Sequence, residues 1–224
     1  MSRALLAVPL LTAALLSGCG EATPDYQSLL ATAPARPTAA SAQESVSLSA
    51  YLESVGVQGR PVAPEKLTDL TVTVPRPEGW RDYTNTNLAP GTRVIADGET
   101  YPTAMLMVFT LDGDFDVAEA LKHADVDAEL SQNFKKLNGS REDFKGFPSS
   151  MIEGTYDLNG QRMQAYNRIV FATGAKPKTP GSTPQRYLVQ LTVTSFADDA
   201  ESKGPAIEKI ISGFDVAGRQ RAPK

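Results

Sequence analysis

The segment at residues 104–111 constrains the fold most strongly, because it is apolar on both sides of a β-strand. Successive side chains of a strand point to opposite faces of the sheet. The large apolar residues here would alternate between the two faces, with Met105, Met107 and Phe109 on one and Leu106, Val108 and Leu111 on or near the other. A strand with no polar side is typical of a sheet that is covered on both faces.

A hairpin is predicted around the sequence Asp157-Leu158-Asn159-Gly160. Asn-Gly is a strong signal for a tight turn between two strands, because both residues accept a positive φ. The flanking segments, 149–156 and 162–172, should therefore be antiparallel neighbours. Alternating or β-branched residues predict further strands at residues 67–74, 92–96 and 187–196.

Helical spacing of apolar residues predicts three helices. The first covers residues 48–55 and is closed by Gly56 and Gly59. The second covers residues 116–124 and starts with Asp116-x-x-Glu119, a pattern that resembles a capping box. The third covers residues 199–212 and stops at Gly213. Residues 125–145 are compatible with either a strand or a helix. Together the elements predict the α+β class, an antiparallel sheet covered by helices on two faces.

The first residues of the chain have the pattern of a lipoprotein signal peptide. Arg3 precedes a short apolar run, which ends at Leu16-Ser17-Gly18-Cys19. This run is too short to span a membrane, and its last four residues match the bacterial lipobox. We expect cleavage after residue 18, acylation of Cys19 and anchoring on the extracytoplasmic face of the cell membrane. The alternative is a chance cysteine at the end of an ordinary signal peptide.

Cys19 is the only cysteine of the chain. If it carries lipid, no thiol remains for a disulfide, a metal or a redox reaction. The net charge is −4 at neutral pH, and removal of Arg3 with the signal peptide makes it one unit more negative. An acidic surface argues against nucleic acid as a partner.

The composition predicts four segments: a signal peptide at 1–18, a lipidated tether at 19–45, a single domain at 46–218 and a short tail at 219–224. The tether is dominated by Ala, Pro, Thr and Ser, which cannot bury enough apolar surface to offset the entropy of ordering. A flexible coil of that length separates its ends by roughly 30 Å. The domain should therefore lie at some distance from the membrane.

Residues that could carry catalysis are scarce. The single histidine, His123, falls in the last turn of a predicted helix, where a cation interacts favourably with the helix dipole. No Gly-x-Ser-x-Gly motif occurs, and Ser140 after Gly139 is the nearest candidate nucleophile. The carboxylates at residues 112–116 lack the glycine and the glutamate of a calcium loop. We therefore expect neither an enzyme nor a metal or cofactor site.

Candidate ligand-binding residues are apolar, with one exception. Trp80 is the only tryptophan, and Met105 and Met107 lie on a predicted strand. Methionine adapts to irregular apolar ligands, although it also fills gaps in ordinary cores. Tyr166-Asn167-Arg168 interrupts an otherwise apolar strand, and Arg168 could pair with a ligand headgroup or with a structural carboxylate.

Several motifs resemble the mycobacterial LpqN/LpqT-type lipoprotein family. They are the lipobox, the proline-rich tether, the PRPEGW segment at 75–80, the EGTYDLNGQRMQAYNRIVF stretch at 153–171 and the closing GFDV at 213–216. The likeness covers about residues 45–217. It implies an α/β/α sandwich with a central antiparallel sheet, of the Mog1/PsbP-like kind. Only Cys19 and its lipobox, Leu16, Ser17 and Gly18, carry over as functional residues.

The resemblance also implies an envelope lipoprotein associated with the transport and synthesis of mycolate lipids. We therefore expect a non-catalytic binding module for an envelope lipid, or for the transporters and enzymes that handle such lipids. One alternative is a hydrolase acting on envelope acyl chains or glycans. Another is a secreted factor that contacts host proteins. An elongated apolar cavity between the sheet and a helix would favour the lipid-binding hypothesis.

Overall fold

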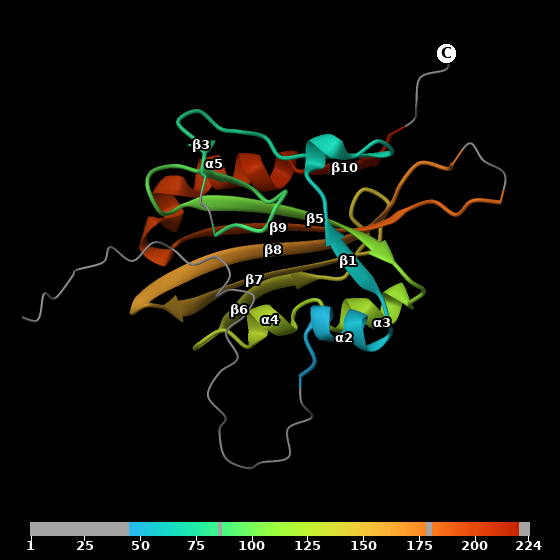
Figure 1. Cartoon of the computed structure of the whole chain (residues 1–224). Coiled ribbons are helices and arrows are strands. Elements are labelled where there is room, and N and C mark those ends of the chain that lie inside the picture. Colours follow the sequence, from blue (N-terminus) through green and yellow to red (C-terminus); the bar gives the residue numbers. More distant parts are fainter. Residues whose placement is uncertain (1–44, 85–86, 178–180, 220–224) are drawn as a thin grey trace, which may run out of the picture.

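A large antiparallel β-sheet forms the centre of the molecule, with helices on both of its faces (Figure 1). The structure is a computed structural model, and it describes residues 45–84, 87–177 and 181–219. Its eight strands include seven in one continuous order: β3 (Arg81–Asp82), β4 (Arg93–Ala96), β5 (Thr103–Asp112), β9 (Arg186–Phe196), β8 (Gln161–Thr173), β7 (Ser149–Leu158) and β6 (Lys135–Ser140). The eighth strand, β1 (Gln58–Pro61), pairs with the end of β5 beyond the segment that β4 occupies.

A two-stranded ribbon and several helices complete the described part of the chain. The ribbon joins β2 (Leu70–Thr73) to β10 (Asp215–Gly218). The helices are α2 (Leu48–Ser54), α3 (Val117–Lys122), α4 (Val126–Glu129) and α5 (Ala200–Gly213), with short 3₁₀ turns at Pro64–Lys66 and Ala197–Asp199. Helix α5 and the ribbon cover one face, whereas α2, α3 and α4 cover the other (Figure 1).

The face under α5 is closed by one continuous apolar core. Val189 and Leu191 of β9 are completely buried, as is Val170 of β8. Ile210 of α5 and Phe214 after it pack into the same cluster, together with Trp80 and both strands of the ribbon. The long amphipathic helix and the ribbon therefore bury one continuous apolar cluster on this face of the sheet. We call this side the closed face.

The face under α2, α3 and α4 is packed differently, because its apolar residues form three separate clusters. The largest joins α2 and α3 to the sheet through Leu52, Ala120 and Phe171. A second lies around Met105 and Met107 of β5, and a third lies around Tyr156 and Met163 at the β7–β8 hairpin. We call this side the cavity face, because the space between the clusters is open.

The fold confirms the predicted α+β class with a central antiparallel sheet. The hairpin forms with Asn159 and Gly160 at positive φ, and β7 pairs with β8 along its whole length. Residues 125–145, left open between strand and helix, contain both: helix α4 and strand β6. The signal peptide, Cys19 and most of the tether lie outside the described residues.

Some boundaries were wrong. The predicted strand at 67–74 is shorter, because Leu67 ends a 3₁₀ turn and pairing with β10 begins at Leu70. Gly59 does not close the first helix but belongs to strand β1. Leu111 lies on the same face as Met105 rather than the opposite one, since the two positions differ by an even number.

Candidate functional site

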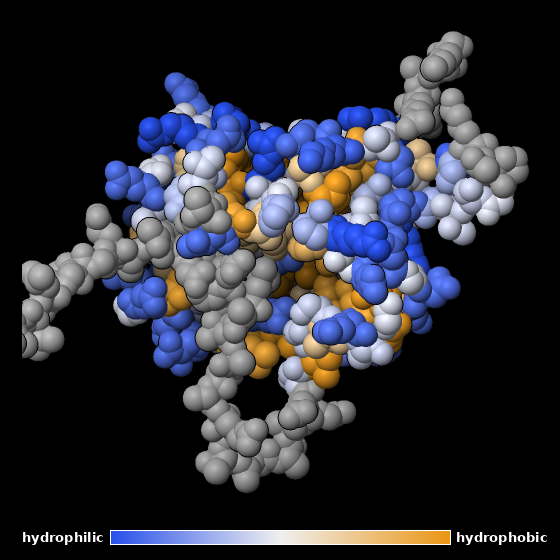
Figure 2. Space-filling view, in the orientation of Figure 1, coloured by the Kyte–Doolittle hydropathy of each residue, from blue (hydrophilic) through white to orange (hydrophobic). Residues whose placement is uncertain are grey.

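A cavity of about 620 Å³ lies between the sheet and the helices α2 and α4. Its floor is formed by inward-facing residues of β5, β8 and β9, and its walls come from α2, β1 and the segment from Ala124 through α4 to Phe134. Apolar side chains are visible at the surface between the sheet and α2 (Figure 2). The volume is within the range of about 300 to 1,000 Å³ typical of small-molecule sites.

The sequence makes the cavity apolar through the two-residue repeat of its strands. Met105, Met107 and Phe109 project from β5 into it, and Ile169 and Leu188 project from β8 and β9. The helices contribute their buried stripes, of which Leu48 and Leu52 of α2 are the largest members. Ala124 and Ala128 are too small to fill the remaining space. The result is a hollow that suits an apolar chain.

Two aromatic rings lie at the hairpin side of the cavity. Phe134 lies against Gly154 of β7, where the Cβ of any other residue would overlap the ring. Tyr156 lies two residues further along the same strand, and burial raises the pKa of its phenol to about 12. The phenol is therefore neutral at physiological pH, and its hydroxyl bonds to Thr194.

The loop between α3 and α4 is fixed to the sheet by a buried carboxylate. Asp125, only 5% exposed, accepts a hydrogen bond of 2.6 Å from the hydroxyl of Ser150 on β7. The guanidinium of Arg141 donates to its other oxygen at 2.9 Å. These bonds hold the start of α4 over the sheet, which keeps the wall of the cavity in place.

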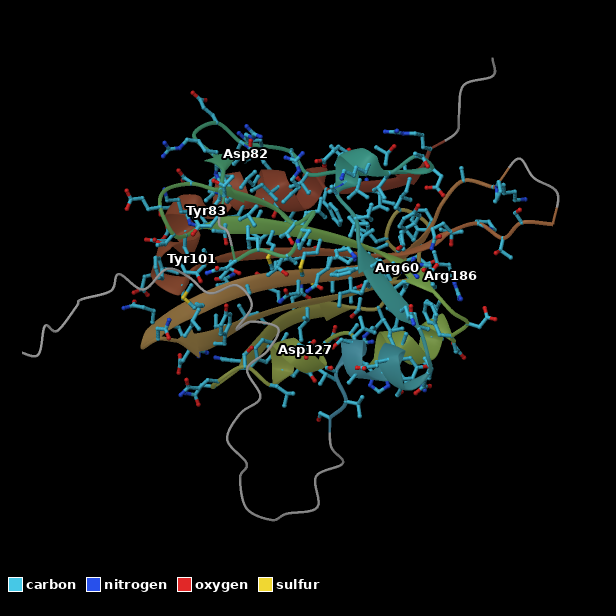
Figure 3. All side chains as sticks on the ribbon, in the orientation of Figure 1. Arg60, Asp82, Tyr83, Tyr101, Asp127 and Arg186 are labelled. Atoms are coloured by element: carbon cyan, nitrogen blue, oxygen red, sulfur yellow. The ribbon has the colours of Figure 1, made fainter. Side chains whose placement is uncertain are left out.

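The rim of the cavity carries charge. Arg60 of β1 is exposed and forms an ion pair with Asp112 at 3.5 Å. Asp127 of α4 is also accessible to solvent, but burial raises the pKa of its carboxyl above the ordinary value. Figure 3 labels both residues, one on β1 and the other on α4. The rim therefore offers both signs of charge around an apolar interior.

A smaller pocket of about 330 Å³ lies on the other face, between the β2–β10 ribbon and strands β4 and β5. Its arginines already have partners. Arg76 donates twice to Asp82 at 2.8 Å, and Arg93 pairs with Glu65 at 3.0 Å. This pocket is a set of exposed ion pairs over an apolar floor, and the larger cavity is the stronger candidate for a ligand.

Comparison with known proteins agrees with this architecture. Residues 44–217 match the family model described as "Probable lipoprotein LpqN". The chain belongs to the LpqN lipoprotein family. It is 56% identical over 202 residues to the protein named "Putative lipoprotein LpqT" of Mycobacterium tuberculosis, covering 90% of this chain and 87% of the relative. The LpqT protein of Mycobacterium leprae is 46% identical over 206 residues, covering 89% and 88%.

The family likeness extends to a solved structure. The crystal structure of LpqN, which is involved in cell envelope biogenesis of Mycobacterium tuberculosis, aligns with a TM-score of 0.62 and 21% identity, covering 78% of this chain and 99% of that one. This match shows a shared fold. The resemblance stated from the motifs is therefore confirmed, and membership of a lipoprotein family implies attachment to the membrane of the cell envelope. No described helix of this LpqN-family chain is long and apolar enough to cross a membrane.

The four candidate ligand-binding residues of this LpqN-family chain do not form one site. Met105 and Met107 line the cavity. Trp80 is 4% exposed and belongs to the core of the closed face. Arg168 also projects from the closed face, where it bonds to Tyr166 and Ser149 and lies over the ring of Phe144. Trp80 and Arg168 therefore lie on the opposite side of the sheet from the cavity, a placement that depends on the fold and is not readable from the sequence.

The cavity contains polar residues that sequence analysis did not select. Asn167 was noted only as part of an interruption in an apolar strand, and Gln190 and Thr192 were not singled out. A signal was present, because Asn167 lies an even number of residues from Met163 and Ile169 and so shares their face. All three polar residues line the floor of the cavity.

His123 and Ser140 have separate structural roles. His123 ends α3, and its Nδ1 lies 2.9 Å from the carbonyl of Val46 while its ring stacks on Tyr51. The hydroxyl of Ser140 accepts a hydrogen bond from the amide of Glu142. Within the described residues, no group of three or more His, Cys, Asp or Glu side chains could hold a metal ion.

Proposed function

We propose that this protein is a membrane-anchored, non-catalytic binding module of the cell envelope, which holds the apolar chain of an envelope lipid in its cavity. The observation that carries the proposal is the cavity of about 620 Å³ between the sheet and the helices α2 and α4, with apolar side chains over most of its lining. Burial of apolar surface contributes roughly 25 cal/mol per Å². A chain that fills such a space gains affinity without specific chemistry.

The position of the cavity relative to the predicted anchor supports the same proposal. Helix α2, which forms one wall, begins at Leu48, only a few residues after the tether. In the proposal Cys19 carries the lipid anchor on the extracytoplasmic face, and the tether lets the cavity approach lipids at or beyond the membrane surface. The contacts of His123 with Val46 and Tyr51 support a structural rather than a catalytic histidine.

The lipid-binding proposal is tested on the full protein purified from the membranes of its own host. Solvent extraction releases lipids that are held without a covalent bond, and mass spectrometry identifies them. We expect the wild type to yield envelope lipids with long apolar chains. Replacing Ala128→Phe on α4 fills part of the cavity, because Ala128 lines it, and should lower the recovered lipid several-fold.

The matched control is Ala118→Phe, the same substitution at an exposed position of α3 outside the cavity. It should yield as much lipid as the wild type. A wild-type protein free of lipid, or equal recovery from the Ala128→Phe and Ala118→Phe variants, would contradict the proposal. Circular dichroism of both variants checks that the sheet is intact.

The anchor is tested separately. Replacing Cys19→Ala removes the thiol that would carry the acyl groups, so the protein should move from the membrane fraction to the soluble fraction. Because Cys19 lies outside the domain, the free energy of unfolding of the domain should not change. Retention in the membrane fraction would contradict lipidation at this residue.

A further inference from the structure

The floor of the cavity has a polar centre within an apolar surround. Thr192 of β9 pairs directly with Asn167 of β8, and Gln190 lies on the same face of β9, two residues away. On the β5 side their neighbours are Met105 and Met107, which lie opposite Thr192 and Gln190. The polar groups are therefore in the middle of the sheet, away from the charged rim at Arg60 and Asp127.

The hydrogen bonds inside this group are incomplete. The hydroxyl of Thr192 donates to the Oδ1 of Asn167 at 2.8 Å, which leaves the Nδ2 donor of Asn167 facing the cavity without a partner among the described residues. The carboxamide of Gln190 also has no hydrogen-bond partner among the residues that the structure describes. Both side chains are only partly buried and line the open cavity, where amides without a protein partner bond to water.

The sheet does not need polar residues at these positions. The alternate residues of β9, Val189 and Leu191, are apolar and completely buried on the closed face. Leucine or methionine at position 190 would continue the apolar lining formed by Met107 and Ile169. A plain hydrocarbon chain in the cavity would displace the water around these amides and leave them without partners, which costs free energy, whereas a polar atom on the chain would restore a hydrogen bond.

We infer that Asn167 and Gln190 bind a hydroxyl or carbonyl oxygen carried part-way along an acyl chain, so that the cavity prefers such chains over plain hydrocarbon. A hydroxyl can accept from the Nδ2 of Asn167 and donate to the Oε1 of Gln190, whereas a carbonyl can accept from both amides. The inference rests on the proposed lipid-binding function and adds a selectivity that an apolar cavity alone would not have.

The test compares octadecanoic acid with a series of octadecanoic acids that bear one hydroxyl, at carbon 3, 10 or 12. All share the same carboxylate and chain length, so that the difference in Kd isolates the hydroxyl. Titration calorimetry uses the full chain with Cys19→Ala, which avoids detergent. We expect at least one hydroxy acid to bind about tenfold more tightly than octadecanoic acid, as one or two net hydrogen bonds allow.

Gln190→Met keeps the length of the side chain and removes its amide. The Kd of octadecanoic acid divided by the Kd of the preferred hydroxy acid should fall close to one. Octadecanoic acid itself should bind as tightly as before or more so. Asn167→Leu is the second variant and should lower the ratio in the same direction. The control is Gln164→Met on the closed side of β8, where the Gln164 amide bonds to Glu153, and it should keep the wild-type ratio.

The outcomes separate the inference from the function on which it rests. If the wild type binds octadecanoic acid and every hydroxy acid equally, or if Gln190→Met and Asn167→Leu both keep the preference, the inference is wrong and the lipid-binding proposal stands. If none of the acids binds to the wild type, the lipid-binding proposal itself is contradicted.

Discussion

The two faces of the central sheet are made from the same strands but are packed in different ways. On the closed face, α5 and the β2–β10 ribbon bury one continuous cluster that includes Val189 and Leu191. On the cavity face, three small clusters leave about 620 Å³ unfilled between them. Alternate residues of a single strand thus contribute to a continuous core on one side and to the lining of an open cavity on the other.

The length of the covering helices explains much of this difference. Helix α5 has 14 residues, whereas α2, α3 and α4 have 7, 6 and 4. Short helices place few side chains on the sheet, and small residues such as Ala124 and Ala128 leave the space beneath them open. We interpret the closed face as the source of stability and the cavity face as the source of function.

The largest effect on the free energy of unfolding is expected when side chains on the two faces are truncated to alanine. Leu191 is completely buried in the closed core, so Leu191→Ala should lower the free energy of unfolding by about 2 to 5 kcal/mol. Met107 already borders empty space, so Met107→Ala should cost only about 1 to 2 kcal/mol, because fewer contacts are lost. Urea denaturation measures both. Equal losses would mean that the cavity face contributes as much to stability as the closed face.

A second comparison uses two glycines of the cavity face. Gly154→Ala would overlap the ring of Phe134, so we expect the ring to be displaced and the free energy of unfolding to fall by about 1 to 3 kcal/mol. At Gly59 of β1 the nearest atoms to an added Cβ are 3.8 Å away. Gly59→Ala should therefore be neutral or stabilise by up to about 1 kcal/mol.

These two alanine variants test whether Phe134 closes one end of the cavity. Thermal and urea unfolding measure their stability, and binding of octadecanoic acid is the second readout. Gly154→Ala should change binding as well as stability, and Gly59→Ala should change binding only slightly. If Gly154→Ala retained wild-type stability and binding, the contact with Phe134 would not define the cavity.

The elements predicted from sequence are those with a local signal. The β7–β8 hairpin follows from Asn159 and Gly160, and α3 starts where the Asp116 carboxylate accepts from the amides of Ala118 and Glu119. Strands β1, β3 and β10 were missed, because each has at most four residues. In addition, β1 and β10 pair with partners far away in the chain.

The cavity could be anticipated only in part. The two-residue repeat correctly places Met105 and Met107 on one face, but it does not say which helix covers that face or how completely. The same repeat does not say on which face of the sheet Trp80 and Arg168 lie until the register between strands is known. Gln190 lies in the middle of a β-branched strand, and its role as a polar floor residue depends on three strands that come together only in the fold.

The smallest effect expected here concerns Asp127 at the rim of the cavity. Burial raises the pKa of its carboxyl above the ordinary value of 3.8, so the ionised form at neutral pH costs stability. Asp127→Asn should therefore stabilise the protein at neutral pH, by less than about 1 kcal/mol because the side chain is partly exposed. The gain should disappear as the pH falls below the ordinary pKa, where the wild-type carboxyl is neutral in both the folded and unfolded states.

Urea denaturation across this pH range measures the gain in the free energy of unfolding. The control is Glu129→Gln, because Glu129 is an exposed residue of the same helix outside the cavity. A gain that persists in acid would show that it does not come from the charge of the Asp127 carboxylate. A loss of stability at neutral pH would show that the surroundings stabilise this carboxylate, and that the rim of the cavity face is polar enough to do so.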